Sequence, residues 1–157
     1  MNNSLDILSE SLDDKIKLLK EIQEYNKKQE QAFSNSEPDM DSFDEAINEK
    51  GELIERLEKL DEGFETLYER VSGELNRNRS QYADQIRNLQ NKITEITELS
   101  TSIQTQEARN KKLIETFFKN QRSSVRKGRV GSKVAYDYYK SMTGAGYGIN
   151  SIMDEKN

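Results

Sequence analysis

The fold is decided by residues 53–71, which read LIERLEKLDEGFETLYERV. Large apolar residues recur there in steps of four and three, and mostly charged residues occupy the positions between them. This rhythm places the apolar side chains on one face of an α-helix and matches the heptad repeat of coiled coils. The residues in the repeat are Leu53, Leu57, Leu60, Phe64, Leu67 and Val71. The stretch therefore predicts a long amphipathic helix, which we expect to span about residues 42–75.

Two further segments carry a similar rhythm, one on each side of the first. The earlier segment, about residues 4–33, has its apolar stripe at Leu5, Leu8, Leu12, Ile16, Leu19 and Ile22. The later segment, about residues 81–127, has Tyr82, Ile86, Leu89, Ile93, Ile96, Leu99 and Ile103. Its pattern fades over residues 104–112 and returns at Leu113, Ile114, Phe117 and Phe118. Each segment is long enough for a helix that must bury its stripe against a neighbour.

Two polar stretches separate these helices. Residues 34–41 contain the only proline, Pro38, and residues 76–80 read NRNRS. Ser42 with Glu45 matches a capping box, which predicts that the second helix starts there. Short loops join helices that lie antiparallel. We therefore expect an all-α fold, an elongated antiparallel three-helix bundle over residues 1–127, followed by a flexible tail over 128–157 in which residues 134–142 have the length for a short helix.

The composition excludes most catalytic chemistry. The 157 residues include no Cys, no His and no Trp, and 34% are charged. Thiol chemistry, zinc sites and Ser-His-Asp catalysis need residues that are missing. The acid pairs Asp13-Asp14 and Asp61-Glu62 are interpreted as parts of solvated helix faces. We therefore expect no enzyme, no catalytic residue, no cofactor and no metal. Neither a signal peptide nor an apolar run of ~20 residues is found, so we expect a cytoplasmic protein without membrane insertion.

The basic tail and the end of the third helix are the candidate binding regions. Residues 119–140 hold seven basic residues and one acid, a charge of +6, so the rest of the chain carries −11 within the total of −5. Tyr136, Tyr138 and Tyr139 lie among these cations, a pattern that also suits nucleic acid. An acidic bundle repels DNA, so we favour a protein partner over nucleic acid, with a tail folded onto its own bundle as the alternative.

The end of the third helix offers a second argument for a protein partner. If that helix outlasts its neighbours, Leu113, Ile114, Phe117 and Phe118 lack intramolecular cover. An uncovered apolar cluster is a candidate partner site.

The chain resembles the FlgN-type flagellar export chaperones of bacteria. The resemblance rests on three long helices without Cys or His, on the stretch NEKGELIERLEKL at residues 48–60, and on Val134-Ala135-Tyr136 followed by IMDEK at residues 152–156. It implies a chaperone that binds the C-terminal helices of hook-associated (hook–filament junction) proteins and delivers them to the flagellar export gate. By the same resemblance, Leu113, Ile114, Phe117 and Phe118 face the client, and Tyr136 or Tyr139 docks at the export gate.

Two other functions fit the same pattern. One is a chaperone or tethering subunit of a different secretion system. The other is a structural coiled coil whose apolar stripes are consumed by a homodimer, with no client. The heptad pattern alone leaves these alternatives and the oligomeric state open.

Overall fold

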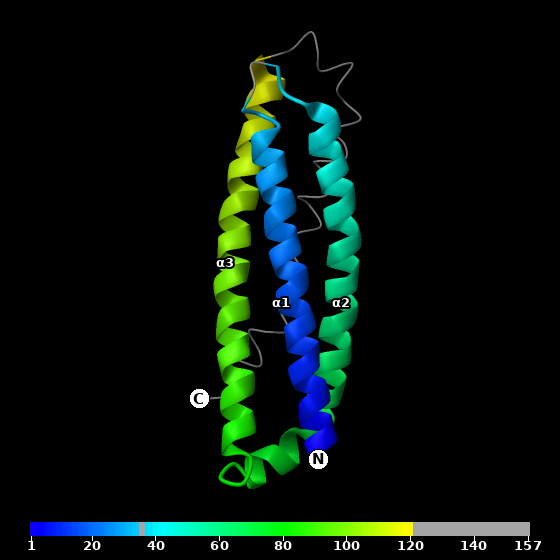
Figure 1. The fold of residues 1–157 in the computed structure, drawn as a ribbon, viewed down its shortest axis with the longest axis vertical. Coiled ribbons are helices and arrows are strands. Elements are labelled where there is room, and N and C mark those ends of the chain that lie inside the picture. Colours follow the sequence, from blue (N-terminus) through cyan, green and yellow to red (C-terminus); the bar gives the residue numbers. More distant parts are fainter. Residues whose placement is uncertain (35–36, 121–157) are drawn as a thin grey trace. The chain divides into compact units, whose positions relative to one another are not determined.

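The computed structural model describes residues 1–34 and 37–120 and consists there of three α-helices (Figure 1). Helix α1 spans Asn2–Gln31, α2 spans Met40–Arg77 and α3 spans Ala83–Asn120. The all-α helical bundle predicted from the heptad rhythm is confirmed. The end of the predicted third helix, up to residue 127, and the tail over 128–157 lie outside the described residues.

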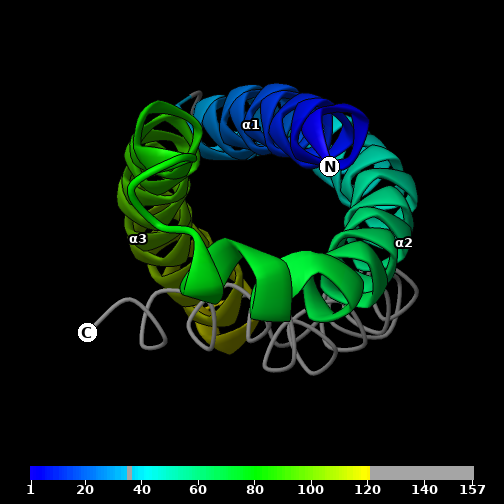
Figure 2. The same ribbon diagram turned by 90° about the horizontal axis from the view of Figure 1, so that it is seen from below.

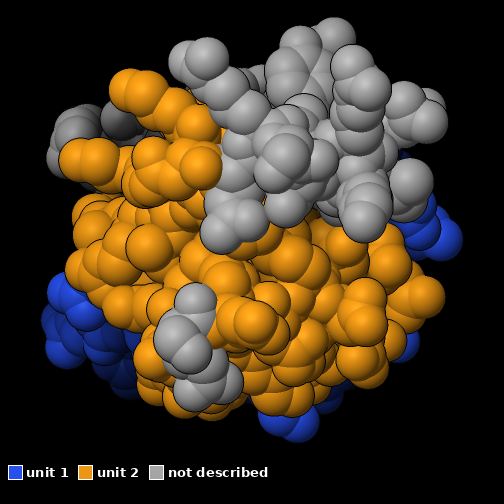
Figure 3. All heavy atoms as spheres, turned by 90° about the horizontal axis from the view of Figure 1, so that it is seen from above, with its two compact units in different colours: residues 1–20, 55–100, 146–157 blue, residues 21–54, 101–145 orange. Residues whose placement is uncertain are grey.

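The helices contribute to two compact units, coloured separately in Figure 3. Among the described residues, unit 1 comprises 1–20 and 55–100, and unit 2 comprises 21–54 and 101–120. In each unit α2 runs antiparallel to α1 and α3. In unit 2, for example, Asn26 contacts Lys50, and Phe33, later in the chain, contacts the earlier Phe43. In unit 1, Asp13 pairs with Lys92, and Lys20 pairs with the later Glu95, so α1 and α3 run in the same direction.

Unit 1 has an apolar core that the heptad pattern predicts. Its most deeply buried side chains include Leu8 and Ile96, both 0% exposed, and Ile93 at 1%. The helices surround this core, and the segment after Arg77 leads from α2 to α3 (Figure 2). Backbone bonds from Asn78 N to Glu74 O and from Tyr82 N to Asn78 O carry the chain through that connection.

The start of α2 differs from the prediction, because its N-terminal cap is Asp39 and not Ser42. The Asp39 carboxylate accepts hydrogen bonds from the Ser42 backbone N at 3.1 Å and from the Ser42 hydroxyl at 2.7 Å. These two bonds, the hydroxyl bond first, lower the pKa of Asp39. An aspartate satisfies a free N–H of the first turn in the same way as serine, so the helix begins two residues earlier than the capping box indicated.

No helix in residues 1–34 and 37–120 combines the length and the hydropathy that a membrane span requires.

Candidate functional site

The end of unit 2 is built from four phenylalanines, which we call the aromatic end: Phe33, Phe43, Phe117 and Phe118. The Phe33 ring lies 5.3 Å from that of Phe43 and 6.0 Å from that of Phe117, both edge to face. Phe117 in turn lies 5.3 Å from Phe118. This edge-to-face packing is the geometry that aromatic pairs favour. Side chains from α2, from α3 and from the residues just after α1 therefore meet at one apolar cluster.

The predicted client-binding residues are partly shielded from solvent at the aromatic end. Ile114 is only 4% exposed, and Leu113, Phe117 and Phe118 are partly buried. The expectation that these four side chains lack intramolecular cover is therefore wrong, and clearest for Ile114. The cover comes partly from Phe33, whose ring packs on Phe117. What stays reachable from solvent is a fraction of Leu113, Phe117 and Phe118.

Next to the aromatic end lies a buried group that we call the polar belt: Asn26, Gln29, Lys50, Glu107 and Asn110. Lys50 Nζ donates to Asn26 Oδ1 and to Glu107 Oε1, each at 2.6 Å. Asn26 Nδ2 donates to Gln106 Oε1 at 3.1 Å, and Asn110 Nδ2 donates to the backbone carbonyl oxygen of Asn26 at 3.1 Å. The belt thus joins all three helices of unit 2 through hydrogen bonds.

Gln29 is the exception within the belt. Its side chain is 0% exposed, yet neither Nε2 nor Oε1 finds a hydrogen-bond partner among the described residues. A buried amide without partners lowers stability by about 1–3 kcal/mol. Of the six polar or charged residues buried in the described part of the chain, five form this belt. The sixth, Lys15, lies in unit 1.

The polar belt was missed because its residues interrupt the apolar stripes without interrupting the heptad rhythm. In α1 the repeat continues from Ile22 through Asn26 and Gln29 to Phe33, in steps of four, three and four. In α3 it continues from Ile103 through Glu107 and Asn110 to Ile114 and Phe117. The apparent fading over residues 104–112 is therefore a substitution of polar residues at core positions. Continuation of the rhythm across polar positions is the signal that identifies them.

The charge on Lys50 is costly at this depth. Burial lowers its pKa from 10.5 to about 8, and the nearby Glu107 carboxylate only partly opposes that shift. Between about pH 8 and 10.5 the unfolded chain holds a proton on Lys50 that the folded chain has released. The free energy of unfolding contributed by Lys50 therefore rises with pH across that window.

A variant that lacks the charged groups of the belt isolates this dependence. We expect the native chain to gain stability relative to the variant Asn26→Leu/Lys50→Met/Glu107→Met when the pH rises from about 7 to about 10. Urea unfolding followed by circular dichroism at both pH values measures the difference in free energy of unfolding between the native chain and the variant. Residues outside the belt titrate alike in both proteins, so their contributions cancel in this difference. A difference that does not change with pH would contradict the buried charge.

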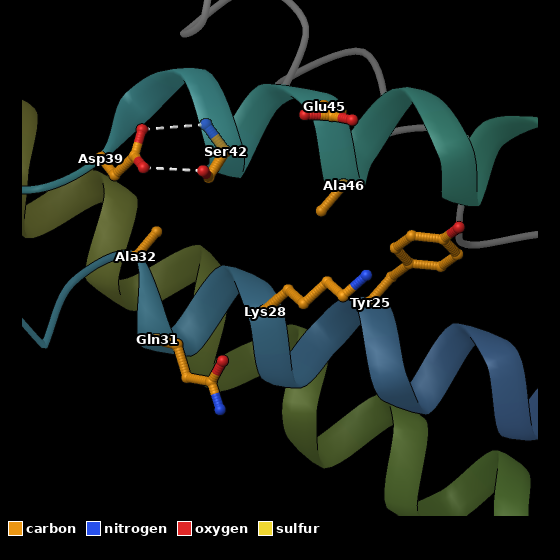
Figure 4. Close-up of a pocket in the computed structure, with 8 residues that line it drawn as sticks. All are labelled: Tyr25, Lys28, Gln31, Ala32, Asp39, Ser42, Glu45 and Ala46. Atoms are coloured by element: carbon orange, nitrogen blue, oxygen red, sulfur yellow. Dashed lines mark hydrogen bonds between the residues drawn. The ribbon is translucent and has the colours of Figure 1, made fainter.

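An open groove of about 380 Å³ lies beside the aromatic end, between α1 and α2 of unit 2. Ala32 and Ala46 point into the space between the two helices, and Lys28 extends toward Tyr25 (Figure 4). The Lys28 ammonium lies 4.9 Å from the centre of the Tyr25 ring. Small side chains at the base and polar ones at the rim make a shallow surface rather than an enclosed ligand pocket.

Unit 1 also holds a partly buried ion pair. Lys15 Nζ lies 2.5 Å from Asp61 Oδ1, and the two side chains are 4% and 23% exposed. Asp61 therefore pairs across to α1, and its interpretation as part of a solvated helix face is wrong. Asp13 pairs with Lys92 at 2.9 Å while its own side chain remains about half exposed.

Comparison with known proteins found one family. Residues 1–142 match the FlgN protein family. Neither the curated proteins nor the solved structures gave a significant match. The matched range includes the aromatic end, the polar belt and Tyr136 and Tyr139, although both tyrosines lie outside the described residues.

Proposed function

We propose that this chain, which belongs to the FlgN protein family and is a flagellar export chaperone, binds the C-terminal helices of hook-associated proteins and delivers them to the export gate. Family membership carries the general function, since the family is one of chaperones and not of enzymes. The choice of client rests on the resemblance described above. The observation that best supports a binding site is the partly buried aromatic end, at the last described turns of α3.

The recognition would be of the helix-in-groove kind. An amphipathic client helix buries its apolar face against partly exposed Leu113, Phe117 and Phe118. Each Å² of apolar surface removed from water contributes ~25 cal/mol, and large aromatic side chains supply much of that area. Because Ile114 is already buried, we assign it to support of the surface rather than to direct contact.

Delivery would use residues beyond the binding surface. We propose Tyr136 or Tyr139 as the docking tyrosine for the export gate, by resemblance to the family. These residues follow the client surface in the chain, so one molecule can hold a client while its tail engages the gate.

The client site is tested by removing its aromatic rings. We expect Phe117→Ala/Phe118→Ala to weaken binding of a hook-associated protein's C-terminal helix at least about tenfold, because truncated aromatic anchors commonly cost that much. Isothermal titration calorimetry measures the affinity, and the helical circular dichroism signal should stay intact. The matched control is Ile7→Ala in unit 1, which truncates a 55% exposed apolar side chain and should leave the affinity unchanged.

Equal affinities for the double variant and the native chain would reject the site. An equal loss in Ile7→Ala would show that the effect is not local to the aromatic end. Sedimentation of the free chain detects a tight homodimer that buries the same surface. Dissociation of such a dimer when client is added would show that the surface binds the client as well as a second copy of the chain.

A further inference from the structure

The distribution of buried polar groups differs between the two units. Among its described residues, unit 1 buries one charged residue, Lys15, within an otherwise apolar core. Unit 2 buries the five residues of the polar belt, at two successive heptad positions of α1 and of α3. Along the helices the belt lies between the aromatic end and the apolar residues Ile22, Ile54 and Ile103. The aromatic end is therefore not continuous, along the core of its own unit, with that apolar packing.

Such a belt weakens the packing that it interrupts. An ion pair only partly offsets the free energy that buried charges lose when water is removed from them. Proteins in which apolar side chains of similar volume replace such a pair are therefore often as stable or more stable. Gln29 adds a buried amide that satisfies neither its donor nor its acceptor among the described residues. On opening, water solvates this amide and the Lys50 ammonium, which lowers the free energy of the open state. Both effects favour separation of the helices at this place over any other place in the described core.

We propose that the polar belt makes the aromatic end a local opening unit, in which the start of α2 separates from α1 and α3 while the core of unit 1 stays packed. The separating segment contributes few large apolar side chains: Phe43 and Ile47 are buried, but the core position that follows them is Lys50. Opening uncovers Phe33, Ile114 and Phe117 together. As a route for client entry this inference rests on the proposed function, whereas the opening itself does not.

Amide hydrogen exchange of the full chain without client tests the opening. We expect amides in residues 43–47 and 110–117 to exchange at least about tenfold faster than those in residues 57–64 and 89–96, as local opening below the global unfolding energy requires. Gln29→Leu removes the unpartnered amide at similar volume and should slow exchange at the aromatic end at least about tenfold, with no change in unit 1. Equal protection of both units, or exchange unaffected by Gln29→Leu, would overturn the proposal.

A second pair of variants keeps the test independent of one substitution. Lys50→Met/Glu107→Met should also slow exchange at the aromatic end, because it replaces a buried ion pair by apolar side chains. The matched control, Lys15→Met/Asp61→Met, removes the corresponding pair of unit 1 and should leave exchange at residues 43–47 unchanged. Faster exchange at those residues in the Lys50 variant would reject the belt as the cause of opening. If Phe117→Ala/Phe118→Ala bound the client as tightly as the native chain in calorimetry, by contrast, only the client site would be rejected.

Discussion

Glu107→Leu is expected to destabilise the chain by about 3–5 kcal/mol, because it removes the carboxylate that pairs with a buried ammonium. Glu107 Oε1 lies 2.6 Å from Lys50 Nζ, and the two side chains are 7% and 0% exposed. Without the carboxylate, Lys50 must keep its charge in a poorly hydrated site or release its proton. Both routes cost free energy at neutral pH. Urea unfolding followed by circular dichroism measures the loss.

The sign of the effect should change when both partners are replaced. Lys50→Met/Glu107→Leu leaves no charge at this position, so we expect it to be neutral or stabilising by about 1–4 kcal/mol relative to the native chain. The coupling between the two sites then follows from a double-mutant cycle. Asp61→Leu is the comparison in unit 1, and its smaller expected loss reflects the 23% exposure of the Asp61 side chain. A double variant as unstable as Glu107→Leu would show that the loss comes from packing and not from charge.

The fold could be predicted from the sequence wherever the heptad positions hold apolar residues. Leu8, Ile93 and Ile96 lie in uninterrupted apolar repeats, and each is at most 1% exposed. Lys50 occupies an equivalent position between Ile47 and Ile54, but a lysine gives no apolar signal. Its partners Asn26 and Glu107, 24 and 57 residues away along the chain, help to make its burial tolerable. A sequence pattern that reads neighbours within one helix does not contain that information.

The candidate site could be predicted only in part, because contacts between different helices are not visible in the pattern of one helix. The pattern located Ile114 and Phe117 on one face of α3 and extends to Phe33 just after α1, but it did not show that Phe33 packs on Phe117. The backbone bond from Asp39 N to Ala32 O at 2.9 Å joins the start of α2 to the residue beside Phe33. Such contacts between segments are not contained in the periodic pattern of a single helix.

The polar belt also has a consequence for how the helices align. Apolar heptads tolerate a shift along the helix, since one leucine replaces another in the core. A buried Lys50 tolerates no such shift, because its partners on α1 and α3 must meet it at 2.6 Å. The belt therefore specifies one register of unit 2 while lowering its stability. Specificity and readiness to open arise from the same residues.

Phe43→Ala is expected to remove about 3–5 kcal/mol from the closure of the aromatic end, the usual cost of truncating a buried phenylalanine. The Phe43 side chain is 0% exposed and packs edge to face on Phe33 at 5.3 Å. It is also the largest apolar contribution of the first turns of α2 to this core. Amides in residues 43–47 should lose most of their protection from hydrogen exchange, and those in residues 89–96 should keep theirs.

Phe64→Ala is the matched control, since it makes the same change on the same helix in unit 1. Phe64 is 6% exposed and stacks on Tyr68 at 6.1 Å. We expect it to speed exchange in residues 57–64 and 89–96 and to lower the midpoint of urea unfolding. If the two variants changed exchange alike throughout the described helices, the chain would unfold as one cooperative body. The aromatic end would then offer its phenylalanines to a client only through the surface that is already exposed.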